Sequence, residues 1–228
     1  MAKSVSNIVT KKIKKPMSFE YNVDVSTIKS RTKFIKQVEN YIRSSLEYRE
    51  YIQFLKDNVD MDQCAFFNKV SSRESKKVKI EIHHEPFTLF DYVEIVLSKF
   101  ESEGLPINNL MIADEVMELH YQNQVGLIPL SKTIHEVIHN SDKLFIPLNT
   151  VYGNYSELLD KYEPYISEEL YDKLEKKMDL TKNVTKDSFE ALIQQFTYIE
   201  SEGVEEVHHM ETSAEKEERE SNAEAKAA

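Results

Sequence analysis

Hydrophobic and polar residues alternate strictly in the segment VKIEIHHEP, residues 78–86. Valine and isoleucine occupy every second position there and are separated by lysine and glutamate. This period of two residues is typical of a β-strand with one buried face. The strand ends in His83 and His84, and Pro86 favours a turn directly after them. The pattern therefore predicts a strand that carries two adjacent imidazoles at its end.

Apolar residues recur every three or four positions over much of the remaining chain, as in amphipathic helices. The longest such stretch predicts a single helix from about Ser26 to Asn58, with a charged outer face. A second helix is predicted to begin at Thr88, a suitable N-cap, and to end before Gly104 and Pro106. Further helices are predicted at about 109–123, 155–161, 167–178 and 186–199.

A second apolar segment, GLIPLSKTIHEVIHN (126–140), is predicted to be a compact turn followed by a short helix. His135 and His139 lie one helical turn apart and therefore share a face of that helix. The strand at 78–84 is predicted to pair in an antiparallel hairpin with CAFFNKV (64–70), because a polar segment joins the two. A strand and a helix that both present imidazoles indicate a metal site.

These elements predict an α+β fold, with a small core of two strands and a helix embedded in a mainly helical protein. We expect five regions along the chain. They are a basic flexible arm (1–25), a long scaffold helix (26–60), the two-strand-and-helix core with a helical insertion (61–148), C-terminal helices (149–200) and an acidic disordered tail (201–228). The long helix is interpreted as a scaffold, with a surface for a protein partner as the alternative.

The amino-acid composition indicates the cellular compartment of the protein and excludes some classes of partner. The chain has 228 residues, a net charge of −11 and one cysteine, Cys64. A single cysteine allows no internal disulfide and suits a reducing compartment. There is no run of about 18 apolar residues, so no membrane contact is expected, and the basic N-terminus lacks the apolar core of a secretory signal. We therefore expect a cytoplasmic protein, in the host cell if a phage encodes it.

The charge is divided between the two ends of the chain. Residues 1–40 carry nine lysines and arginines against three acidic residues, whereas residues 201–228 carry nine glutamates against three basic residues. A basic arm of this kind is typical of nucleic-acid contacts. The candidate phosphate-binding residues are Lys11, Lys12, Lys14 and Lys15.

The sequences IEIHHEP and GLIPLSKTIHEVIH together resemble the HNH, or ββα-metal, nuclease motif. In that family a strand ends in Asp-His or His-His, a short apolar turn containing proline follows, and a helix then supplies further histidines. The resemblance covers about residues 62–148 and is closest to HNH proteins of bacteriophages. It implies a metal-dependent endonuclease that hydrolyses DNA phosphodiester bonds.

The resemblance also implies roles for individual residues. His84 would be the general base that activates water, while His83 and His135 would bind one divalent ion, Mg²⁺, Mn²⁺ or Zn²⁺. His139 would be a further ligand of that ion or a group that supports the ligands. The central asparagine of the family falls at Gly126 in this chain. Asn123, three residues earlier, is the candidate that replaces it.

Two alternatives remain open at this point. The same core would also suit a phage protein that has lost catalysis and binds nucleic acid or another protein. In addition, His135, Glu136 and His139 form the HExxH pattern of zinc metalloproteases, in which two histidines bind zinc and the glutamate is the general base.

Overall fold

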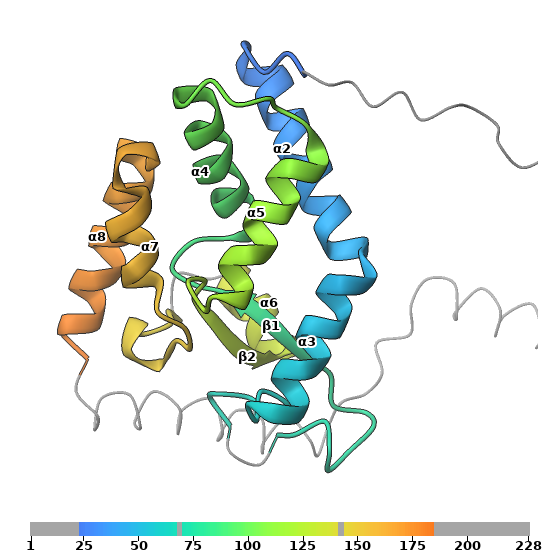
Figure 1. Ribbon diagram of the computed structural model, residues 1–228. Coiled ribbons are helices and arrows are strands. Elements are labelled where there is room, and N and C mark those ends of the chain that lie inside the picture. The colour runs from blue at the N-terminus through green and yellow to red at the C-terminus, as the bar shows by residue number, and fades with distance from the viewer. Residues whose placement is uncertain (1–22, 68–69, 141–143, 185–228) are drawn as a thin grey trace, which may run out of the picture. The chain divides into compact units, whose positions relative to one another are not determined.

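The computed structural model describes residues 23–67, 70–140 and 144–184 (Figure 1). Its first helical segment consists of two helices, α2 (Ile28–Ser44) and α3 (Leu46–Asn58), instead of the single helix expected for 26–60. The break lies at Ser45, whose backbone is extended and whose hydroxyl accepts the N–H of Tyr48. A serine that caps a helix competes with continuation of the preceding one. The single long helix was therefore a wrong prediction.

The core is formed by α2, α4 (Leu89–Ser102) and α5 (Asn109–Tyr121), which pack against one another beside α3 (Figure 1). Thr88 caps α4 in a reciprocal capping box with Asp91, and Asn108 caps α5. Both helices lie where the sequence predicted them. Most of α4 is buried, including Tyr92, whose hydroxyl accepts the N–H of Gly126 just before β2.

The sheet contains two antiparallel strands, β1 (Ile80–His84) and β2 (Leu127–Ser131). In this register His83 lies opposite Ile128. The expected hairpin partner, 64–70, does not form a strand in its described part, so the hairpin prediction was wrong. The described residues of that segment turn instead, and the residues on either side of it, Gln63 and Ser71, form an isolated bridge. The segment predicted to be an apolar turn is itself the second strand.

The helix α6 (Lys132–Asn140) follows β2 without a linker. The order is therefore strand, strand, helix, with α4 and α5 inserted between the strands. Together with the predominance of helices, this small antiparallel sheet confirms the α+β fold class.

The C-terminal part of the described chain is helical. It contains the 3₁₀ turns Leu148–Thr150 and Glu163–Tyr165, together with α7 (Tyr155–Tyr162) and α8 (Glu168–Lys182). Residues 1–22 of the basic arm, the helix expected at 186–199 and the acidic tail lie outside the described residues, as do all four candidate lysines of the arm. The division into five regions remains a prediction.

Candidate metal centre

Three imidazoles converge where the end of β1 meets α6. His83 extends from β1, and His135 and His139 extend from one face of α6, one turn apart. Each offers a nitrogen atom within 4.8 Å of those of the other two. The Nε2 atoms of His135 and His139 are 3.0 Å apart. Nitrogen ligands of one tetrahedral ion at about 2.0–2.1 Å lie roughly 3.3 Å from each other, so the spacing suits a shared ion.

Glu81 fixes the orientation of the His135 ring. Its Oε2 lies 2.7 Å from Nδ1 of His135, so this nitrogen donates to the carboxylate and Nε2 is directed to the other imidazoles. Lys79 holds the same carboxylate at 2.8 Å. Hydrogen bonds from Lys79 and His135 keep the pKa of Glu81 below its ordinary value. A carboxylate behind a histidine is the usual outer partner of a metal ligand.

Glu85 places a second carboxylate beside the site. Its side chain is buried, with Oε2 3.5 Å from Nε2 of His83, and it forms an ion pair with Lys177 of α8. Burial raises the pKa of Glu85, but the hydrogen bond from His83 and the Lys177 ammonium outweigh burial, and the pKa lies below its ordinary value. Lys177 also donates to the carbonyl oxygen of Pro86 at 3.0 Å. The helix α8 therefore fixes the segment that follows His83 and His84.

Replacing Lys177 with methionine is expected to destabilise the protein by roughly 2–3 kcal/mol, because a buried Glu85 carboxylate loses its cationic partner. The estimate is below the roughly 3–5 kcal/mol expected for a fully buried ion pair, since the Lys177 side chain is 27% exposed. Urea denaturation measures the difference. The matched control is Lys182→Met on the same helix, whose ion pair with Asp179 is exposed and should contribute less than about 0.5 kcal/mol. Equal effects of the two substitutions would contradict the role of Lys177.

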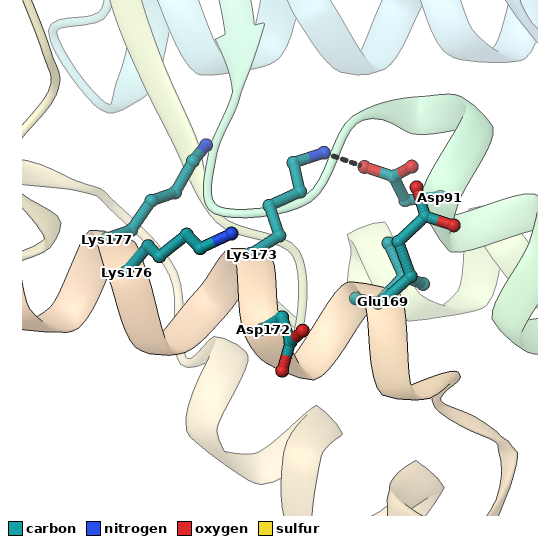
Figure 2. A pocket seen from close by; sticks show the side chains of 7 residues that line it. Asp91, Glu169, Asp172, Lys173, Lys176 and Lys177 are labelled. Carbon is teal, nitrogen blue, oxygen red and sulfur yellow. Dashed lines mark hydrogen bonds and ion pairs between the residues drawn. The ribbon is translucent and has the colours of Figure 1, made fainter.

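A hollow of about 480 Å³ lies along α8. Figure 2 shows Lys173, Lys176 and Lys177 extending from this helix, with Lys173 paired to Asp91. Lys177 is paired to Glu85, and the acidic side chains of Glu169 and Asp172 line the same hollow. Opposite charges therefore nearly balance in this hollow, which disfavours the binding of a phosphate group.

The structure places His84 away from the three imidazoles. Successive side chains of a strand point to opposite faces, so His84 faces the helical core while His83 faces α6. His84 is 5% exposed, and its Nε2 lies 3.1 Å from Nε2 of His120 on α5. Its ring stacks on Tyr48 and lies close to Tyr92. The role of His84 as general base remains a prediction.

Asn123 is likewise not part of the cluster. It follows Gln122, the C-cap of α5, and lies in the left-handed backbone region, with φ of 56°. Its side-chain oxygen accepts the hydroxyl of Tyr152 at 3.3 Å, and its backbone N–H donates to the carbonyl of His120. Its observed contacts shape the turn before β2, and its catalytic role remains a prediction.

His120 was absent from the site residues predicted from the sequence. It is fully buried on α5, where its helical spacing resembles that of any core residue. Burial lowers its pKa to about 4, outweighing a hydrogen bond to the carbonyl of Val116. Only the folded structure, which brings α5 beside the end of β1, connects His120 to His84.

Acidification is expected to destabilise the fold through His120. The pKa of His120 is about 4 in the folded protein, whereas its ordinary value is 6.5. Below about pH 6.5 the unfolded chain therefore binds a proton at this residue that the folded chain does not bind. Stability is complete above pH 6.5 and falls as pH decreases from there towards 4. Between about pH 7.5 and about pH 5 the loss should reach roughly 2 kcal/mol. Urea denaturation at each pH measures it, and His120→Gln should flatten the slope; an unchanged slope would contradict this origin.

The donor set favours particular metals. Three imidazole nitrogens suit Zn²⁺, Cu²⁺, Ni²⁺ or Fe²⁺, whereas Mg²⁺ prefers oxygen ligands. These three imidazoles, with Glu81 behind His135, would hold a zinc-like ion. Of the three ions expected from the sequence, Zn²⁺ therefore fits best.

Glu136 does not behave as the glutamate of a metalloprotease site. Its side chain is 61% exposed and pairs with Lys132 at 3.5 Å on the outer face of α6. The third imidazole of the cluster comes from His83 on β1, a residue that the HExxH pattern does not explain.

The fold and the cluster together define an α+β protein in which two strands and a helix bring three imidazoles to one point. A protein-family model, that of the bacteriophage G278-like virion protein, matches residues 3–226. The chain belongs to this bacteriophage family, whose description names a virion protein. Comparisons with curated proteins and with solved structures give no match. Within the described residues, no helix has both the length and the apolar character needed to cross a membrane. The expected cytoplasmic location remains a prediction.

Proposed function

We propose that this phage virion protein is a metal-dependent phosphodiesterase of HNH type that acts on DNA. The observation that carries the proposal is the convergence of His83, His135 and His139 from a strand and a helix in strand–strand–helix order. The motif resemblance runs through the same residues. A protein packaged with or delivered beside a DNA genome would meet this substrate.

Each residue near the centre has a defined task under this proposal. His83, His135 and His139 bind the ion, and Glu81 fixes the ring of His135. The ion, when bound, stabilises negative charge on the scissile phosphate and the departing oxygen. The motif resemblance assigns the general base to His84, and this role would require the buried face of β1 to open to water, because His84 points away from the three imidazoles. The lysines of the N-terminal arm contribute phosphate contacts, by charge attraction alone.

A plasmid-nicking assay tests this function. Wild-type protein with Zn²⁺, Mn²⁺ or Mg²⁺ should convert supercoiled plasmid to the nicked form, and chelation should stop the reaction. His135→Ala should abolish nicking because it removes a ligand, whereas Glu136→Gln should leave it intact, because Glu136 lies on the outer face of α6. Nicking by wild type that survives His135→Ala would overturn the proposal.

The alternative of a binding protein without turnover is favoured by the burial of His84. In that case the ion would hold α6 against β1, and its removal would lower stability. The same experiment separates the two. If the protein bound one of the three ions tightly but nicked plasmid with none of them, the metal centre would have a structural role and no catalytic one.

A further inference from the structure

The outer face of α2 carries a row of lysines. Lys29, Lys33 and Lys36 follow one another at intervals of four and three residues, so they lie on one side of the helix. All three are exposed, whereas the buried side chains of α2 lie on its opposite side. The helix as a whole has five lysines and arginines against one glutamate. It is therefore strongly basic, although the net charge of the whole chain is −11.

The arginines of α2 have acidic partners, but the lysines of the row do not. Arg31 pairs with two glutamates of α4, and Arg43 pairs with a glutamate one turn earlier in α2. Among the described residues, no carboxylate forms an ion pair with any of the three lysines. The arginines therefore hold the helix in place, while the lysines present their charges to solvent.

The stability of α2 does not account for this row. Lys29 is the second residue of the helix, and the first turn contains no acidic residue. A positive charge at this end is opposed by the helix dipole. Lys33 lies four residues after Lys29 and three before Lys36, and like charges at these spacings repel each other on a helix surface. A bound polyanion would relieve both unfavourable interactions.

The chemistry of this face fits the phosphate backbone of duplex DNA. Lys29 and Lys36 are seven residues apart, or about 10 Å along the helix axis, and duplex DNA carries one negative charge per about 1.7 Å of its axis. Lysine is a flexible point charge, which suits phosphate contacts that carry no sequence information.

Other macromolecules fit this face less well. Lysine is depleted in protein–protein interfaces, which are built around apolar anchors. The row contains no apolar side chain and continues at the same spacing to Asn40, another exposed polar residue. Sites for single-stranded nucleic acid combine positive charge with aromatic side chains on which bases stack, and the row has none. Duplex DNA is therefore the partner that these side chains favour.

We propose that Lys29, Lys33 and Lys36 bind the phosphate backbone of double-stranded DNA. This inference rests on the proposed action on DNA and adds a binding surface to it. The surface lies on α2, whereas the candidate metal centre lies on β1 and α6. Each lysine that neutralises a phosphate releases counter-ions from the DNA, so binding by this face is independent of sequence and weakens as salt increases.

Fluorescence anisotropy of a labelled DNA duplex of arbitrary sequence tests the surface with the full-length, metal-loaded protein. The triple variant Lys29→Gln, Lys33→Gln, Lys36→Gln should bind roughly 100-fold more weakly at about 0.1 M salt. The slope of log affinity against log salt should become less steep by up to about 2.7. Arginine at the same three positions keeps the charges and should keep the affinity. Urea denaturation should show that the glutamine variant is at least as stable as wild type, because it removes like-charge repulsion.

The matched control is the triple variant Lys161→Gln, Lys176→Gln, Lys182→Gln, which removes the same charge from exposed lysines of α7 and α8 and should bind DNA as wild type does. Unchanged affinity of the α2 variant, or an equal loss in the control, would overturn the inference. Tighter binding of a single strand than of the duplex would do the same. A wild type that binds duplex DNA through α2 but never nicks plasmid would support this surface and refute the proposed catalysis.

Discussion

Replacing His135 with alanine is expected to abolish tight Zn²⁺ binding. The substitution removes one of three imidazole donors, so that only His83 and His139 remain to bind the ion. The loss should exceed the roughly 10–100-fold that removal of an outer-shell partner costs. Competition titration against a chelator of known affinity measures it. His83→Ala should behave in the same way, because it removes the donor from β1.

Glu81 provides a graded comparison. Glu81→Gln keeps an oxygen that can accept from Nδ1 of His135 but removes the charge, so we expect a smaller loss, within about 10–100-fold. Glu136→Gln is the control on the same helix, since its side chain pairs with Lys132 on the exposed face. Retention of wild-type affinity by both His135→Ala and His83→Ala would show that the three imidazoles do not share an ion.

Part of this centre was predictable from local pattern. Alternation of apolar and polar residues predicted β1, and the spacing of His135 and His139 placed both on one helical face. Glu81 and His83 lie two apart in a strand and therefore share a face. These relations depend on neighbours in the sequence, which is why they were visible without the fold.

Strand pairing was not predictable in the same way. The true partner of β1 is β2, which follows two inserted helices, whereas the nearest apolar segment, 64–70, only turns. Because prolines are common in turns, Pro129 favoured the prediction of a turn at the residues that form β2. A proline removes one ladder donor but is tolerated where its N–H is not required, and its carbonyl oxygen accepts the N–H of Ala65 at 2.8 Å.

The long-range contacts of charged and buried groups could not be predicted from the sequence either. Lys177 and Glu85 are separated by 92 positions, and His120 resembles an ordinary core residue of an amphipathic helix. Neither pattern nor propensity pairs such residues, because their contacts form only when α5 and α8 pack beside the end of β1. The sequence therefore predicted that His83, His135 and His139 lie together, but neither the buried histidine pair nor the ion pair from α8.

Gly126 shows where the family resemblance and the fold differ. The resemblance places the central asparagine at this position, which suggests that Gly126→Asn would strengthen activity. Both backbone groups of Gly126 form hydrogen bonds. Its N–H donates to the hydroxyl of Tyr92, and its carbonyl oxygen accepts the N–H of Glu85, each at 3.0 Å. No side chain fits between these contacts.

Gly126→Asn and Gly126→Ala are both expected to destabilise the protein by about 3 kcal/mol or more. A Cβ atom at this position would lie 1.8 Å from the carbonyl oxygen of Glu85, so the backbone of β2 or of the segment after β1 must move. That movement would displace Glu85 and the end of β1, and nicking should fall. Urea denaturation and the plasmid assay measure the two effects. The matched control is Gly104→Ala, where φ is +65° but no atom lies within 4 Å, and the cost should be only about 1–2 kcal/mol from the backbone conformation. If Gly126→Ala shifted the denaturation midpoint no more than Gly104→Ala, the close packing of β2 against Glu85 would be refuted.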